Sequence, residues 1–270
     1  MKGLGSARSK RILICVGLNL LLELWVHGIT GFLNPVLAVS LLLIYLSYFM
    51  ILDDLVTRLR LRDYQVLILG FTYGMLHETF NTGSVFNEAF LMGVNPVNIF
   101  MANVLWWGVL QSVFAYYFAS TVVRSGEGNA IKMGARGWIF AVGVNAFFFA
   151  VLALEGNYPE GTRSGYVISV VLIACAVLAF IISVVGLKSG NVTRVERVRF
   201  VDTVIRAQMV VCVLLGVLHS FVLGEIALYL FVAWSVFTGA VYTVFAVKGH
   251  RFIGCVVSPC SNFQSMTHAG

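Results

Sequence analysis

Three histidines and two glutamates stand inside long apolar stretches of this 270-residue chain. They are His27, His77, His219, Glu23 and Glu78. An ionisable side chain at the centre of a membrane-inserted helix costs about 2.5–3.5 kcal/mol, so such residues usually face the protein interior and serve a function. Imidazole and carboxylate groups transfer protons and bind metal ions. The sequence therefore predicts a buried polar site that contains these five residues.

Amide, hydroxyl and indole side chains recur at helical spacing around the ionisable residues. Residues four apart lie on one face of a helix, so each set forms a polar stripe that should face inward. The predicted substrate-binding residues are Asn19, Tyr73, Asn81, Asn103, Trp107, Gln111 and Asn145. The alternative for these side chains is interhelical hydrogen bonding alone, which contributes about 0.6 kcal/mol per contact on average.

The depth of the five ionisable residues supports a common site. Each residue of a helix adds about 1.5 Å of depth, and the three helices that carry them are expected to run outward. Counted from the cytoplasmic start of each helix, the five residues lie within about 6 Å of one another in depth. This layer falls slightly to the extracytoplasmic side of the membrane midplane. Depth does not give direction around the helix, so a shared pocket is a hypothesis.

Such a layer is typical of several functions. The favoured one is an intramembrane enzyme for a lipidic or isoprenoid substrate. His27, His77 and His219 would hold zinc with an open fourth position while Glu78 or Glu23 acts as the base. In a metal-free version, the same carboxyl groups would carry out acid–base chemistry. The alternatives are a proton-coupled transporter, a haem-binding or structural subunit of a larger membrane complex with His77 and His219 as ligands of haem b, and a purely structural polar network.

The elements that must position these residues are transmembrane helices. Hydrophobic residues make up 59% of the chain and charged residues 11%, whereas soluble domains carry about 25% charged residues. This composition excludes an ordinary soluble enzyme, a disordered chain and a coiled coil. Eight apolar stretches are long enough to cross a bilayer core of about 30 Å: 12–31, 35–52, 64–82, 97–120, 137–154, 165–187, 204–224 and 226–247. We expect an all-α, polytopic integral membrane protein with about eight transmembrane helices.

The basic residues predict the orientation of these helices. All but one of the 18 Lys and Arg residues fall on one face of the eight-helix arrangement, and Arg163 is the exception. Cytoplasmic loops collect Lys and Arg, so both termini are predicted to be cytoplasmic in the cell membrane. Residues 1–11 form a basic N-terminal tail, 12–250 a single transmembrane domain and 251–270 a short C-terminal tail. The net charge of +6 is thus explained by topology, and the expected partners are membrane lipids and a hydrophobic substrate rather than nucleic acid.

Two further motifs are assigned structural roles. Gly70 and Gly74 are four residues apart, which predicts the close approach of a neighbouring helix. Asp53 and Asp54 could hold Mg²⁺ on a diphosphate. However, there is only one such pair, and Asp54 is correctly spaced for an ordinary ion pair with Arg58. A solvated helix end is therefore the expected role of the two aspartates.

Two parts of the sequence resemble known membrane enzymes. Residues 74–86, followed by 93–96 and Trp106, resemble the helix–loop–helix of membrane carotenoid-modifying enzymes. The layer of three histidines is similar to that of seven-helix ceramidase-type hydrolases. No diagnostic motif is shared with either family, so no residue role is transferred from them.

Overall fold

The structure is a computed structural model that describes residues 7–89, 91–123, 132–154, 163–186 and 199–218, together with residues 234, 238 and 241. Apart from an isolated bridge between Leu91 and Val94, every element in these residues is helical, which confirms the predicted all-α class. The α-helices are α1 (Ala7–Leu22), α2 (Leu24–Phe32), α3 (Pro35–Leu59), α4 (Asp63–His77), α5 (Pro96–Asn98), α6 (Ala115–Val122), α7 (Ala135–Leu154), α8 (Arg163–Gly186) and α9 (Arg199–Leu218). The remaining elements are the π-helical turn η1 (Glu78–Thr82), the 3₁₀ turn η2 (Ser84–Phe86) and the π-helix η3 (Ile99–Phe114).

Four helical stretches in the described residues are long and apolar enough to cross a membrane. They are Ala7–Gly28, Pro35–Leu59, Pro96–Val122 and Ser164–Val185. Their length and composition are those of a membrane protein. The expected stretch 226–247 lies outside the described residues except for positions 234, 238 and 241, which are helical. The number of about eight helices and the cytoplasmic side of the termini therefore stay predictions.

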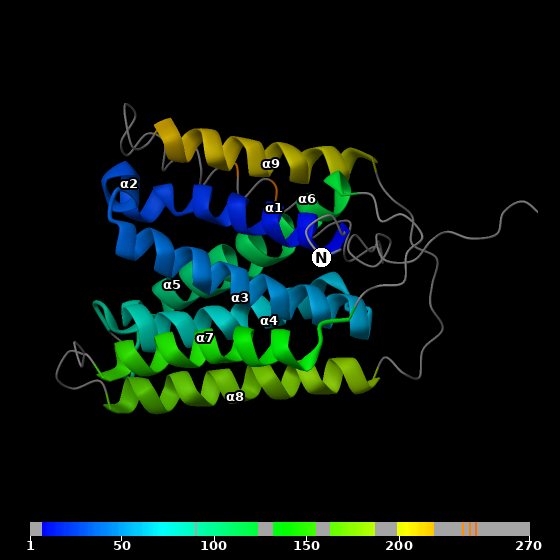
Figure 1. Ribbon diagram of the computed structural model, residues 1–270. Helices are drawn as coiled ribbons and strands as arrows, with labels where there is room; N and C mark the ends of the chain where they lie inside the picture. The colour runs from blue at the N-terminus through cyan, green and yellow to red at the C-terminus, as the bar shows by residue number, and fades with distance from the viewer. Residues whose placement is uncertain are drawn as a thin grey trace, which may run out of the picture.

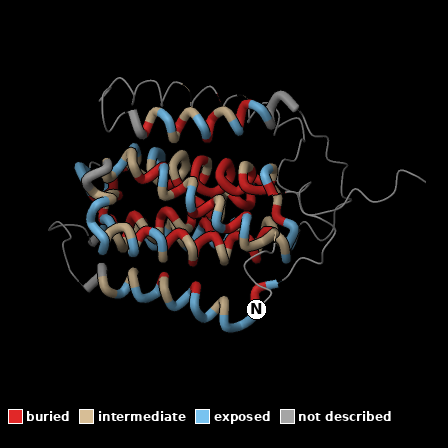
Figure 2. Tube along the Cα trace, turned by 45° about the horizontal axis from the view of Figure 1, so that its top comes forward, coloured by how far each residue is buried: buried red, intermediate tan, exposed pale blue. Residues whose placement is uncertain are grey.

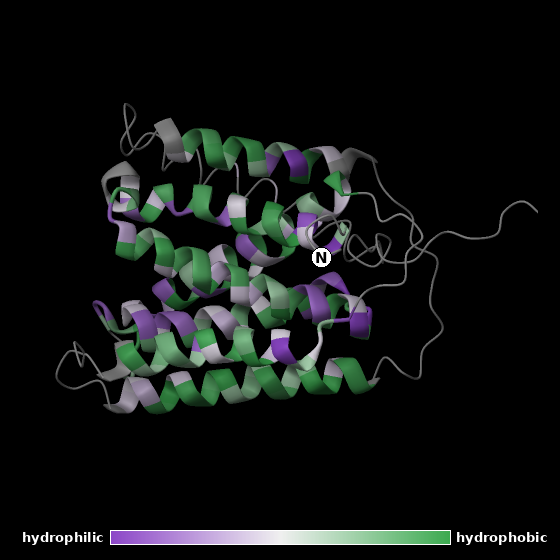
Figure 3. Ribbon diagram, in the orientation of Figure 1, coloured by the Kyte–Doolittle hydropathy of each residue, from purple (hydrophilic) through white to green (hydrophobic). Residues whose placement is uncertain are grey.

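The helices lie side by side, with α8 and α9 at opposite edges of the bundle (Figure 1). The helix α4 packs against η3 and α8, while α3 packs against α1 and α7. Buried residues are concentrated in the middle of the bundle, and α8 is mostly exposed (Figure 2). The helix α8 is also hydrophobic along nearly its whole length (Figure 3), as is typical of a peripheral helix in a membrane bundle.

Asparagine–proline pairs start two of the helices. The Oδ1 of Asn34 accepts hydrogen bonds from the backbone N–H groups of Val36 and Leu37 at the start of α3. Asn95 caps α5 in the same way. Each asparagine satisfies N–H groups that have no partner within the helix, and the proline that follows already has a helical φ. These caps fix the points at which the chain re-enters the bundle.

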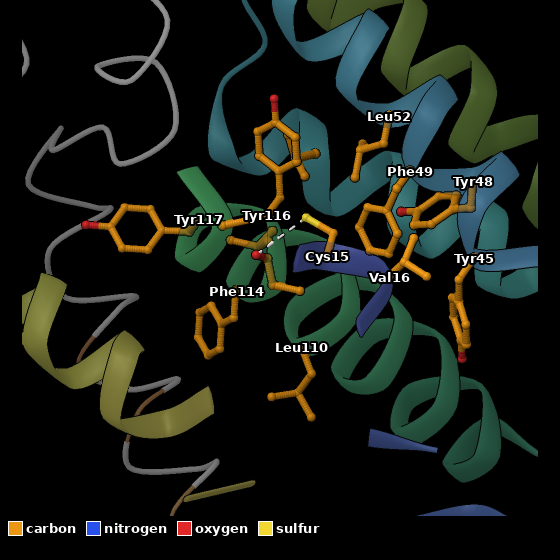
Figure 4. Close-up of a cluster of buried hydrophobic side chains, with 14 of the residues drawn as sticks. Cys15, Val16, Tyr45, Tyr48, Phe49, Leu52, Leu110, Phe114, Tyr116 and Tyr117 are labelled. Carbon is orange, nitrogen blue, oxygen red and sulfur yellow. Dashed lines mark hydrogen bonds between the residues drawn. The ribbon is translucent and has the colours of Figure 1, made fainter. Parts of the chain in front are cut away.

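The hydrophobic core brings α1, α3, η3 and α6 together (Figure 4). Cys15 of α1 donates a hydrogen bond from Sγ to the carbonyl oxygen of Ala115, 3.7 Å away. Aromatic side chains fill much of the core, including Tyr45, Phe49 and Phe114. Because tyrosine combines a large apolar ring with a hydroxyl group, it packs in such a core and still supplies hydrogen bonds.

Gly70 and Gly74 allow α4 to lie directly against η3. A Cβ atom on Gly70 would stand 2.7 Å from the carbonyl oxygen of Trp107. On Gly74 it would stand 2.7 Å from the Trp107 Cβ atom and 2.9 Å from the Oδ1 of Asn103. Any side chain at either position would push the two helices apart. The predicted close approach of a neighbouring helix is confirmed.

The expectation of a solvated helix end at Asp53 and Asp54 is wrong, because both side chains are buried. Asp53 accepts a hydrogen bond from Arg11 at 2.6 Å and pairs with Arg8 at 3.1 Å. The basic residues that were expected in a tail form the first turn of α1 and pack against α3. The helix α1 therefore begins at Ala7 rather than near residue 12. Periodicity placed the two aspartates at a helix end but did not show that another helix packs over them.

Asp54 connects two further parts of the chain to these charged side chains. It receives hydrogen bonds from the Met133 backbone N–H at 2.6 Å and from the Trp138 indole at 3.1 Å. Arg58 lies 2.8 Å away, which confirms the expected ion pair. The two carboxylates thus receive hydrogen bonds and ion pairs from α1, α3, α7 and the segment before α7, as buried charges require.

Candidate functional site

Glu23 lies between α1 and α2, where three other side chains meet its carboxylate. Its Oε1 accepts hydrogen bonds from the Tyr45 hydroxyl and, at 3.2 Å, from the Gln111 amide. That amide also donates to the Tyr45 oxygen at 2.8 Å, so the two residues fix each other. The Oε2 of Glu23 lies 3.4 Å from the Nε2 of His27. One oxygen is therefore anchored and the other faces an imidazole.

The Glu23–His27 pair has a buried end and an accessible end. The side chain of Glu23 is 7% exposed, whereas that of His27 is 32% exposed. Residues four apart on a helix can form such a pair. The contact therefore joins a shielded carboxylate to a partly exposed imidazole. This geometry is what a general acid or base requires, because the group must exchange protons and still be shielded.

Trp107 joins this pair to the polar residues of α4. Its ring lies 5.7 Å from that of Tyr45 on one side and 4.8 Å from that of His77 on the other, measured between centroids. Both His27 and His77 lie close enough to Glu23 to interact with its charge. The structure thus brings together the predicted residues of the first, third and fourth apolar stretches.

Glu78 is engaged by four neighbours. Its Oε1 accepts a hydrogen bond from the Trp107 indole at 2.9 Å and lies 3.3 Å from the Nδ1 of His77. Its Oε2 accepts from Thr82 at 2.6 Å and from Ser84 at 2.5 Å. Two of these partners belong to the turn that follows α4. The carboxylate therefore holds this turn against the helices, and its contacts are those of a structural anchor.

Some of the remaining predicted substrate-binding residues form hydrogen bonds between or within helices. Others have amide groups with no hydrogen-bond partner among the described residues. Tyr73 donates to the Oδ1 of Asn145 at 2.5 Å, and the Asn145 amide donates to Ser47 at 2.8 Å. These bonds join α4, α7 and α3. Asn81 and Asn103 find no hydrogen-bond partner among the described residues for either amide atom. Asn19 donates to the carbonyl oxygen of Cys15 in its own helix.

The predicted metal ligands are not all in the described part of the chain. His27 contacts Glu23 and His77 contacts Glu78, but His219 lies outside the described residues. Within the described ranges no three His, Cys, Asp or Glu side chains gather as a metal-binding group. The zinc hypothesis and the haem hypothesis both need His219, so both stay predictions.

Three of the partners that shape the site were not predicted from the sequence. Tyr45 is the closest neighbour of Glu23, and Thr82 and Ser84 hold Glu78. Tyr45 stands in a stretch with no polar stripe, where a tyrosine usually indicates packing. Tyr45 could have been recognised because Tyr48 follows it three residues later, so two tyrosines stand on one side of an apolar helix. Both hydroxyls find buried partners, as burial of a tyrosine demands.

Comparison with protein-family models, with curated proteins and with solved structures finds no match to this chain.

Proposed function

We propose that this protein is an intramembrane enzyme that performs acid–base chemistry on a lipidic or isoprenoid substrate, with Glu23 as the reacting carboxyl group and His27 as its proton-exchange partner. The observation that carries the proposal is the Glu23–His27 contact of 3.4 Å, in which the carboxylate is shielded and the imidazole is partly exposed. The proposal places the site in the extracytoplasmic half of a bundle of about eight helices with cytoplasmic termini.

The contacts of the two glutamates favour Glu23 over Glu78 as the reacting group. Glu78 has four neighbours on its two oxygens, so a substrate would have to displace one of them. Glu23 has two hydrogen bonds on Oε1, while Oε2 faces only His27 among the contacts that surround it. Tyr45 and Gln111 would hold the carboxylate in place during proton transfer. The metal-dependent version of the enzyme requires His219 in addition.

A comparison of membrane lipids tests the proposal. Cells that produce the wild-type protein, Glu23→Gln or Glu88→Gln are extracted, and the lipids are compared by mass spectrometry. Glu88 is the matched control because it lies exposed in the loop after η2. Loss of a general acid or base lowers the rate by about 10²–10⁴-fold. We expect a lipid species that depends on the wild-type protein, persists with Glu88→Gln and is lost with Glu23→Gln. Identical extracts from all three would refute an enzyme of this kind.

The same pair also supports proton-coupled transport, because Glu and His at membrane depth are the usual relay of such carriers. Purified protein in liposomes that contain a pH-sensitive dye distinguishes the two functions. A proton flux that Glu23→Gln abolishes, with no change in any lipid, would favour the transporter. A change in lipids without proton flux would favour the enzyme.

A further inference from the structure

We propose that Glu23, together with Asn19 and Gln111, binds the primary ammonium group of a lipid. This site rests on the proposed function for its lipid substrate and adds the polar group that the lipid presents to the reacting carboxyl group. The hydrogen-bonding atoms around Glu23 and its negative charge select that group.

Two buried oxygen atoms beside Glu23 have no donor. The Oδ1 of Asn19 and the Oε1 of Gln111 find no hydrogen-bond partner among the described residues, and both side chains are fully buried. Asn19 lies one helical turn before Glu23, whose backbone N–H donates to the Asn19 carbonyl oxygen at 3.0 Å, so the two side chains share a helix face. Gln111 contacts the Glu23 carboxylate directly. A buried acceptor without a donor is destabilising, and in native proteins it marks a place where another molecule or ion binds.

The nitrogen atoms of the same two amides already have partners. The Nδ2 of Asn19 donates to the carbonyl oxygen of Cys15 at 2.8 Å. The Nε2 of Gln111 donates to Glu23 at 3.2 Å and to the Tyr45 oxygen at 2.8 Å. The Tyr45 hydroxyl itself donates to Glu23. The atoms left for a ligand are therefore oxygen acceptors.

The charge of Glu23 is not held by a close ion pair. In the described part of the chain no lysine or arginine pairs with this carboxylate, and the basic group that contacts it is His27, with 3.4 Å between Nε2 and Oε2. A charge-assisted hydrogen bond from nitrogen to a carboxylate oxygen is about 2.7–2.9 Å long. Since a buried carboxylate needs a positive partner at close range, Oε2 is the third acceptor of the site.

A primary ammonium group matches these three oxygen atoms. It carries one positive charge, three donors and no acceptor. A water molecule or an alcohol would bring lone pairs that need donors of their own, and it would leave the charge of Glu23 uncompensated. A quaternary ammonium group would supply the charge but no donor. A lipid that carries a primary amine brings this group, with its apolar tail, to a site inside an apolar bundle.

Binding of a defined amine tests the site. The full-length protein is placed in nanodiscs of phosphatidylcholine, which has no primary amine, and radiolabelled dodecylamine is added by equilibrium dialysis with empty nanodiscs as the baseline. We expect saturable binding above this baseline. An excess of unlabelled dodecylamine should displace the label, whereas dodecanol, dodecyltrimethylammonium and sodium chloride should not, because none of them combines a positive charge with three donors.

Two variants each remove one of the unpaired oxygen atoms, and a third is the matched control. Gln111→Met keeps the length of the side chain, and loss of a hydrogen bond to a charged group should weaken the binding of dodecylamine by about tenfold. Gln208→Met makes the same change at another fully buried glutamine, whose partners are Cys212 and Thr238, and should leave the affinity unchanged. Asn19→Leu leaves the hydrogen bonds of Gln111 to Glu23 in place, so it should weaken binding similarly even where Gln111→Met fails to fold.

Every other result overturns the ammonium site. Equal displacement by dodecanol would show that only the apolar tail or a hydroxyl group is bound. Displacement by dodecyltrimethylammonium would show recognition of charge without hydrogen bonds, and displacement by sodium chloride would show a site for an inorganic cation. Binding no greater than that of empty nanodiscs, or equal effects of Gln111→Met and Gln208→Met, would show that the oxygen atoms around Glu23 do not hold the amine.

The ammonium site and the proposed function fail separately. Selective binding of dodecylamine without any lipid conversion by the wild-type protein would support the site and refute the enzyme. Lipid conversion that depends on Glu23, in a protein that does not bind dodecylamine selectively, would do the reverse.

Discussion

Replacing Asp53 by asparagine keeps the size of the side chain but removes its negative charge. Asp53 lies 2.6 Å from Arg11 and 3.1 Å from Arg8, and it accepts a hydrogen bond of 3.0 Å from the Tyr116 hydroxyl. The Arg11 side chain is buried with it. The variant therefore leaves a guanidinium group in the bundle without its counter-charge. Removal of one partner of a buried ion pair costs about 3–5 kcal/mol.

The cost should appear as a lower unfolding temperature. For chains of about this size, 1 kcal/mol corresponds to roughly 2–4 °C, so Asp53→Asn should lower the Tm by about 6–20 °C. The assay is thermal unfolding of the purified protein in detergent, followed by tryptophan fluorescence. The control is Arg58→Gln, because Arg58 also pairs with an aspartate but its side chain is 40% exposed. When Arg58 is replaced, the buried Asp54 keeps its hydrogen bonds from the Met133 N–H and the Trp138 indole, so this variant should lower the Tm less than Asp53→Asn does.

A double variant separates the charge from the packing. Asp53→Asn combined with Arg11→Met removes the uncompensated charge, so the combination should be less destabilised than the sum of the two single changes. Should Asp53→Asn and Arg58→Gln lower the Tm equally, the two aspartates would be solvated, as the sequence suggested, and the packing of α1 on α3 would be refuted.

Three other predictions follow from the described contacts. Gly74→Ala places a Cβ atom 2.7 Å from that of Trp107 and should cost about 1–3 kcal/mol of stability, measured by thermal unfolding, whereas Gly143→Ala should cost little. Glu78→Gln weakens the hold of the carboxylate on the turn after α4, so amide hydrogen exchange in residues 83–95 should become faster, and unchanged exchange would contradict the anchoring role. If the C-terminus is cytoplasmic, as predicted from the basic residues, a membrane-impermeant maleimide should label Cys260 only after cells are opened, and labelling of intact cells would refute the topology.

The sequence predicted the features that depend on composition and on spacing along one helix. Long apolar stretches and sparse charge indicated a helical membrane protein, and the structure has four helical stretches of spanning length in its described part. The close approach at Gly70 and Gly74 also depends on local chemistry, and it is present. In each case the residues themselves determine the geometry.

Features that depend on the neighbouring helix could not be predicted. The spacing predicted that Glu23 and Glu78 lie at similar depth. It did not show that Tyr45 donates a hydrogen bond to Glu23, or that Ser84 donates one to Glu78. The burial of Asp53 has the same cause, because its partner Arg11 lies on a helix 42 residues away along the chain. Rotation about a helix axis is set by tertiary packing, which a periodic pattern does not specify.

Isotope incorporation can show whether Glu23 acts as an acid or base on a lipid. Purified protein is mixed with lipid extract in water enriched in deuterium and in the heavy oxygen isotope, and the lipids are analysed by mass spectrometry. We expect that one lipid species gains carbon-bound deuterium or heavy oxygen with the wild-type protein and with Glu88→Gln, but not with Glu23→Gln. Equal incorporation with Glu23→Gln, or none with the wild-type protein, would contradict it.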